Sequence, residues 1–118
     1  MSENLIQSKS FMFAVRVVNL YKVLTSERKE FVLSKQLLRA GTSIGANVRE
    51  AQNGESKADF IHKLGIAQKE ADETLYWLEL LKATDYLKSN EFDSMHHDGT
   101  ELLKIIRTII LNTKRNHN

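Results

Sequence analysis

A helical repeat of apolar residues from Leu37 to Leu87 constrains this chain more than any other feature. Within the repeat, the segment 39–50 (RAGTSIGANVRE) combines small residues, two glycines and several polar groups. Apolar residues at three- and four-residue intervals form one face of a helix, which must be buried against a neighbour. Because Gly41 and Gly45 carry no side chain, that neighbour is expected to approach closely. The pattern predicts a tight helical bundle.

The composition favours an all-α domain. The 118 residues include no proline, which breaks helix interiors, and only five glycines. A chain of this length can bury a substantial core, so we expect a single domain over residues 1–118. The lack of cysteine excludes disulfides and thiolate chemistry. Together with the lack of a long apolar segment near the N-terminus, it predicts a cytoplasmic protein.

Apolar spacing and turn residues predict four helices, at residues 8–24, 27–53, 56–87 and 90–114. Thr25 or Ser26 is expected to cap the second helix. Ser56 is expected to cap the third, with Asp59 completing a capping box. Because short connections favour antiparallel neighbours, the expected fold class is an all-α, antiparallel up-down-up-down four-helix bundle.

The third predicted helix carries apolar residues outside its core stripe. At 100° per residue, Ile66, Trp77 and Leu80 lie on the side opposite that stripe. A helix of a solitary bundle buries one side, so these three residues predict an interface between subunits. The alternative is that Trp77 lies at the edge of the bundle beneath a loop.

A set of polar residues in the helical block predicts a structural polar cluster, made of Arg39, Asn47, Glu50 and Glu73. Arg39 and Glu50 are three turns apart and cannot pair with each other, so Arg39 is expected to reach Glu73 on the third helix. We interpret the cluster as a network that fixes the register of the helices. A ligand or catalytic site is the alternative, but the sequence signals no accompanying nucleophile or metal.

The histidines are weak candidates for chemistry. Asp93 and His97 are four residues apart, which allows both to face one metal ion, and His96 lies beside them. Without a second such pair, a solvated surface is favoured. No phosphate-binding glycine loop or His-Glu-x-x-His motif occurs. We therefore assign no catalytic residue, metal, cofactor or small-molecule substrate, and an enzyme is the least favoured class.

The net charge of +2 hides an uneven distribution. Residues 1–41 carry seven basic and three acidic side chains, residues 42–101 carry six and twelve, and residues 102–118 carry four and none. Either subunits pair basic on acidic surfaces, or the basic ends bind an anion, or the surface is merely solvated. The candidate nucleic-acid contacts are Lys22, Arg28, Lys29, Lys104, Arg107, Lys114 and Arg115. In an up-down bundle the first three lie at the end opposite the C-terminal tail, so a monomer would not form one patch.

From Leu33 to Leu87 the chain resembles the bacterial four-helix-bundle proteins called 23S rRNA-intervening-sequence proteins. The residues that carry the resemblance are 36–40 (QLLRA), 43–50 (SIGANVRE), 59–67 (DFIHKLGIA) and 69–81 (KEADETLYWLELL). They lie within about half of the chain, and residues before and after match only in pattern. One departure is Ala51, where the family often has glycine.

This resemblance implies an antiparallel four-helix bundle and a homo-oligomer, with a pentameric ring as the expected form. It also implies a gene sometimes found inside 23S ribosomal RNA insertions. A related group, the accessory proteins of diversity-generating retroelements, forms basic rings that bind RNA and a reverse transcriptase. The expected function is therefore a non-enzymatic homo-oligomeric bundle that binds RNA or a ribonucleoprotein. The alternative is a structural or protein-interaction oligomer that binds no nucleic acid.

Overall fold

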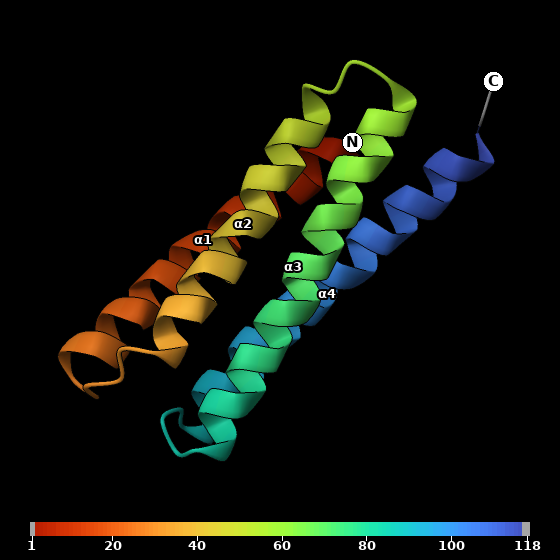
Figure 1. Ribbon diagram of the computed structural model, residues 1–118. Helices are drawn as coiled ribbons and strands as arrows, with labels where there is room; N and C mark the ends of the chain where they lie inside the picture. The colour runs from red at the N-terminus through yellow and green to blue at the C-terminus, as the bar shows by residue number, and fades with distance from the viewer. Residues whose placement is uncertain (1, 117–118) are drawn as a thin grey trace.

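Four α-helices make up the protein in a computed structural model that describes residues 2–116 (Figure 1). Their bounds are Ser2–Ser26 (α1), Leu33–Gln52 (α2), Lys57–Ala83 (α3) and Ser89–Arg115 (α4). No β-strand occurs within this range, so the all-α four-helix bundle is confirmed. The chain reverses at each connection in Figure 1, which is consistent with up-down-up-down order. The bundle is a rod with extents of 51 × 21 × 20 Å.

All four helices contribute to one apolar core along the axis of the rod. Each helix packs against its neighbours in sequence, and α1 also contacts α4, though less extensively. The largest fully buried apolar side chains are Ile6, Val17, Leu24, Leu37, Ile44, Val48, Leu64, Leu78, Leu81 and Ile106. Within each helix the buried apolar residues follow helical spacing and form one stripe. Burial of these stripes against one another accounts for the bundle.

The glycine pair brings α1 and α2 together. A β-carbon at Gly41 would lie 2.7 Å from Cγ2 of Val17, closer than two carbon atoms can approach. A β-carbon at Gly45 would lie 3.3 Å from the backbone oxygen of Ser10. The two glycines therefore allow a close approach of the helices at two successive levels, as the sequence predicted.

The boundary between α1 and α2 differs from the prediction. Thr25 and Ser26 do not cap α2, because their hydroxyls donate to carbonyls one turn earlier within α1. The Glu30 side chain caps the start of α2 instead. Its carboxylate accepts the backbone N–H groups of Val32 (3.1 Å), Leu33 (2.9 Å) and Ser34 (2.6 Å). The first free amides of a helix require such acceptors. Hence α2 begins at Leu33 rather than at residue 27, and α1 begins at Ser2 rather than at residue 8.

The other two connections agree with the sequence in part. Ser56 caps α3 as predicted, since its hydroxyl oxygen accepts the backbone N–H of Asp59 at 3.0 Å. α3 ends at Ala83 rather than at residue 87, and Asp85 then adopts a left-handed conformation with φ 69°. At the start of α4, the carboxylate of Glu91 accepts the N–H of Lys88 at 2.9 Å.

Candidate nucleic-acid interface

Ion pairs across the bundle join the basic N-terminal part of the chain to its acidic middle. Four basic side chains of α1, α2 and their connection pair with a carboxylate on α3 or α4. The pairs are Lys9–Glu101, Arg16–Asp98, Arg28–Glu91, Arg39–Glu70 and Arg39–Glu73. The charge excesses of residues 1–41 and 42–101 are therefore partly offset within one subunit.

Arg39 lies where the sequence predicted, opposite Glu73 on α3. Its guanidinium pairs with Glu73 and also with Glu70, at 3.2 Å. Trp77 donates its indole N–H to the same Glu73 carboxylate at 2.9 Å, so the network positions the indole ring. Because the Arg39 side chain is 47% exposed, these pairs are expected to add little stability and mainly to fix side-chain positions.

Two other members of the predicted polar cluster lie apart from Arg39. The Asn47 amide donates to the carbonyl of Ser43 in the preceding turn of α2, at 2.9 Å. Glu50 pairs with Lys63 at 2.9 Å, near the other end of the α2–α3 pair. The expected single cluster is thus three separate sets of contacts, because Asn47 bonds within its own helix and Glu50 pairs with a lysine nearer the α2–α3 connection.

The C-terminal half of α4 presents four exposed basic side chains on one side, with the exposed Leu111 among them. Residues 102–116 contain no acidic side chain. Lys104, Arg107, Lys114 and Arg115, here called the α4 basic face, are all exposed. At 100° per residue and 1.5 Å rise they fall within an arc of about 100° and extend over roughly 16 Å of the helix. Such a stripe can contact several phosphates of one nucleic-acid strand.

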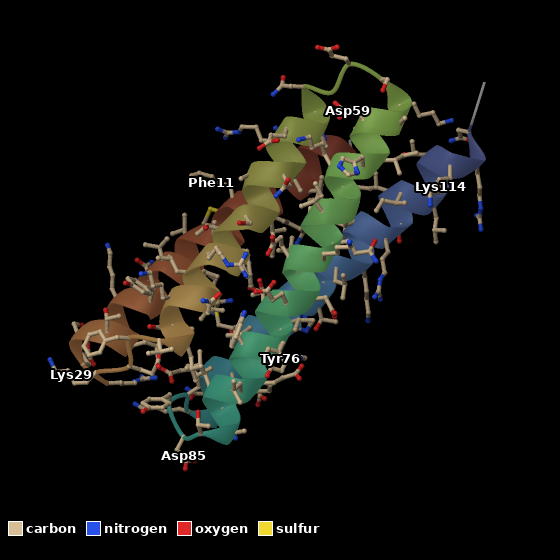
Figure 2. All side chains as sticks on the ribbon, in the orientation of Figure 1. Phe11, Lys29, Asp59, Tyr76, Asp85 and Lys114 are labelled. Atoms are coloured by element: carbon tan, nitrogen blue, oxygen red, sulfur yellow. The ribbon has the colours of Figure 1, made fainter. Side chains whose placement is uncertain are left out.

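The remaining candidate contacts lie at the opposite end of the rod, where Figure 2 labels Lys29 far from Lys114. Lys22 and Lys29 are exposed. Arg28 is instead committed to the fold: its guanidinium donates to Tyr86 O at 2.8 Å and to both oxygens of Glu91, at 2.9 and 2.7 Å. That hydrogen-bonded pair raises the pKa of Arg28 and lowers the pKa of Glu91. Arg28 therefore links the α1–α2 connection to the α3–α4 connection and to α4, and most of its hydrogen-bonding capacity is used within the fold.

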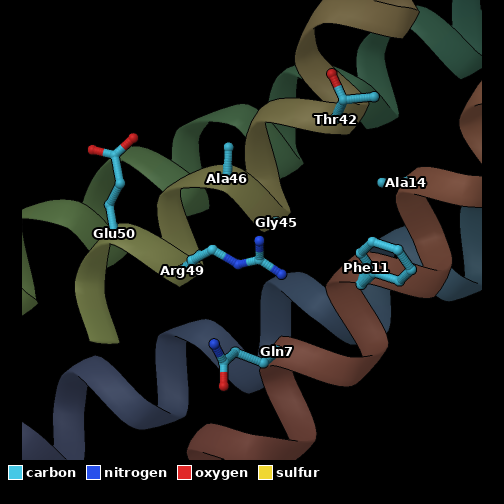
Figure 3. A pocket seen from close by; sticks show the side chains of 8 residues that line it. All are labelled: Gln7, Phe11, Ala14, Thr42, Gly45, Ala46, Arg49 and Glu50. Carbon is cyan, nitrogen blue, oxygen red and sulfur yellow. The ribbon is translucent and has the colours of Figure 1, made fainter. Parts of the chain in front are cut away.

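A surface groove runs along the junction of α1 and the second half of α2 (Figure 3). It has a volume of about 450 Å³ and is lined by Gln7, Phe11, Ala14, Thr42, Gly45, Ala46, Arg49 and Glu50. Figure 3 shows the Arg49 side chain lying across the groove towards Gln7 and Phe11. Arg49 has no ion-pair partner within the described chain. Small side chains from α2 make the groove, which sequence reasoning treated only as a site of helix packing.

The predicted subunit interface on α3 is only partly exposed. Ile66, Trp77 and Leu80 are half-buried, and Trp77 packs against the edge of the core. The more exposed large apolar side chains are Tyr76 beside Trp77, Leu5, Phe11, Met12 and Val15 on α1, Phe31 and Val32 before α2, and Leu111 on α4. Sequence reasoning missed Phe31 and Val32 because it placed both inside the second helix.

The histidine pair on α4 makes ordinary surface contacts. His96 lies 2.9 Å from a carboxylate oxygen of Glu79 and packs against the ring of Phe92. His97 is exposed. Over residues 2–116, no group of three or more potential ligands is placed to hold a metal ion. In the same range, no helix combines the length and apolar character needed to cross a bilayer.

Fold and surface together define a small all-α four-helix bundle whose candidate site is a charged face. The model of the 23S rRNA-intervening sequence protein family matches residues 2–108, and the chain belongs to that family. A crystal structure of a protein with unknown function from the S23 ribosomal protein family of Bacteroides thetaiotaomicron is similar to it. The two are 57% identical with a TM-score of 0.92, over 93% of this chain and 98% of that chain. No curated protein matches the sequence.

Proposed function

We propose that this protein is a non-enzymatic, cytoplasmic homo-oligomer that binds RNA or a ribonucleoprotein through the α4 basic face. The observation that carries the proposal is the run from residue 102 to residue 116, which has four exposed basic side chains and no carboxylate. Most other arginines are already paired with acids across the bundle. The family to which the chain belongs adds support, since its name refers to a ribosomal RNA segment.

Contacts from this face would go to phosphates rather than to base edges. Four phosphate contacts release condensed counterions, which gives a slope of about −3 for log affinity against log salt concentration. Such contacts supply affinity without sequence specificity. A homo-oligomer would repeat the face on every subunit and raise the affinity for a long RNA by avidity.

Self-association is proposed to use the outer face of α3, which carries Ile66, Trp77 and Leu80, and where the exposed ring of Tyr76 packs against Trp77. A closed ring is the proposed form, with five subunits as the expectation from the family. Trp77→Glu would place a charge in this interface and should yield a monomer or an insoluble chain. Light scattering after size-exclusion chromatography gives the mass; an unchanged particle would show that this face is not the interface.

The central test is fluorescence anisotropy with a structured ribosomal hairpin across a salt series, with DNA of the same length for comparison. Lys104→Gln/Arg107→Gln should weaken RNA binding at least tenfold and flatten the salt dependence. Lys69→Gln/Lys82→Gln is the matched control, because it removes the same net charge from α3 and should change the affinity less than twofold. Equal effects of the two pairs would argue against the α4 basic face.

A protein-interaction oligomer is the second candidate function. The apolar surface of α1, with Phe11 58% and Met12 57% exposed, favours it, because large exposed apolar residues often mark protein contacts. The anisotropy experiment separates the two candidates. A wild-type protein that binds no RNA even at low salt would favour the protein-interaction oligomer.

A further inference from the structure

The α1–α2 connection is rigidly held although it lies at the end of the rod. The Glu30 carboxylate accepts three backbone N–H groups of the first turn of α2, and the Ser34 hydroxyl donates to the Glu30 carbonyl at 2.8 Å. Lys29 takes a left-handed conformation, with φ 58°, to complete the turn. Arg28 fastens the connection to Glu91 and to the α3–α4 connection. The conformation of this loop is therefore set by the fold, before any partner binds.

This rigid loop displays two bulky apolar side chains that the fold does not use. Phe31 is 58% exposed and Val32 is 72% exposed, whereas Glu30, the residue directly before them, is buried. An aromatic ring held outwards on a fixed backbone loses little conformational entropy when it binds. The pair is therefore a preorganised apolar contact rather than a disordered loop tip.

Three exposed lysines lie at the same end of the rod as Phe31 and Val32. Of the seven basic residues in positions 1–41, Lys9, Arg16, Arg28 and Arg39 pair with carboxylates on α3 or α4. The other three are Lys22, Lys29 and Lys35, which have no ion-pair partner within the described chain and lie in the last turns of α1, in the connection and in the first turn of α2. The connection itself contains two carboxylates: Glu30 accepts the amides at the start of α2, and Glu27 is exposed. The basic residues of positions 1–41 that have no ion-pair partner thus all lie within ten positions of Phe31, at one end of the rod.

We propose that this tip, defined as Lys22, Lys29, Phe31, Val32 and Lys35, binds single-stranded RNA by stacking an unpaired base on Phe31 while the lysines contact its phosphates. Aromatic rings flanked by cations are the usual means of binding single strands without sequence preference. The inference rests on the proposed RNA-binding function and adds a second contact, at the end of the rod opposite the α4 basic face.

Other ligands fit the tip less well. A duplex keeps its bases stacked inside the helix and cannot present one to Phe31. A free phosphate would seek the amides at the start of α2, but the Glu30 carboxylate already occupies them. An anionic membrane surface would also attract lysines and apolar side chains, so it must be an explicit arm of the test.

The experiment compares Phe31→Leu and Phe31→Trp with the wild type on three RNAs: an unstructured single strand, a blunt duplex and a hairpin with that stem. Phe31→Leu keeps the apolar volume and removes the ring, so single-strand affinity should fall roughly five- to tenfold, within the range for loss of one stacked base. Duplex affinity should change less than twofold. Phe31→Trp should bind single strands at least as tightly as the wild type, with quenched indole fluorescence. Phe11→Leu is the matched control, since Phe11 is also 58% exposed.

Each outcome decides the inference. Equal single-strand binding by the wild type and Phe31→Leu would overturn it, as would a wild type that binds only the duplex; in both cases the RNA-binding function of the α4 basic face survives. A Phe31→Trp emission that responds to vesicles of anionic phospholipid but not to RNA would make the tip a membrane contact. A wild type that binds none of the three RNAs would overturn both the inference and the proposed function.

Discussion

Two glycines in helix interiors offer a comparison in which the same substitution should have opposite effects. Gly41 faces Val17, whose side chain is fully buried, and an added β-carbon would lie 2.7 and 2.8 Å from its two methyl groups. Gly65, on the outer side of α3, has no atom within 4 Å of the same position. Alanine favours a helix over glycine by about 0.5–1 kcal/mol at either site. Any difference between the two variants therefore measures packing.

At Gly65 only the difference in helix propensity between glycine and alanine applies, so Gly65→Ala should stabilise the protein by about 0.5–1 kcal/mol. At Gly41 the overpacking term is about 1–3 kcal/mol. Because valine is branched and its rotamer is restricted, Val17 cannot turn away, and we expect the upper part of that range. After the gain in helix propensity is subtracted from this cost, Gly41→Ala should destabilise the protein by about 1–2 kcal/mol.

Urea unfolding at one fixed protein concentration provides the measurement, because association would shift the midpoint. Gly41→Ala should unfold at lower urea than the wild type and Gly65→Ala at higher urea, with similar slopes. Adding Val17→Ala should make Gly41→Ala nearly neutral relative to Val17→Ala alone, a coupling of about 1–2 kcal/mol. If the Gly41→Ala and Gly65→Ala variants were equally stable, this would show that the close approach of α1 and α2 does not limit the size of the side chain at position 41.

Further predictions concern the same helix pair and the start of α2. Gly45→Leu should destabilise by about 3 kcal/mol or more, because the new side chain meets the backbone oxygen of Ser10, which cannot rotate away; an unchanged melting temperature would contradict this. Burial would raise the pKa of Glu30, but its backbone hydrogen bonds outweigh that effect and lower it. The stability from Glu30 is therefore present above its unfolded pKa of about 4.3 and is lost as pH falls through the lower folded pKa. Urea midpoints between pH 5 and 2 should fall more for the wild type than for Glu30→Gln, and parallel curves would show that this carboxylate does not act through its charge.

The fold was largely predictable because burial of one apolar stripe per helix is a local property of the sequence. The error at α2 has a physical reason. Helix starts are recognised by a short polar side chain directly before the helix, whereas Glu30 reaches the free amides from three residues before Leu33. Phe31 and Val32 also continue the apolar pattern, so nothing in the sequence distinguishes an exposed loop from another helical turn.

The site was less predictable, since it depends on which basic residues find partners. Arg39 and Glu73 could be paired in advance because neighbouring helices with a short connection leave few registers. Lys9 and Glu101 are separated by 92 positions, and their pairing depends on the whole bundle. The lysines at the tip can be recognised as unpaired only after every such ion pair has been identified.

The net charge of +2 therefore understates the positive potential at the two ends of the rod. Ion pairs neutralise the middle of the bundle, while the tip around Phe31 and the α4 basic face lie towards opposite ends of a body 51 Å long.

Sites so far apart should contribute additively to the binding free energy of an RNA that reaches both. Shorter RNAs can occupy one site only. We expect affinity to rise steeply once an RNA with a single-stranded end is long enough to span the rod, as linkage of two contacts requires. Anisotropy with RNAs of graded length measures this, and a smooth rise with length in both the wild type and Phe31→Leu would mean that the two ends do not act together.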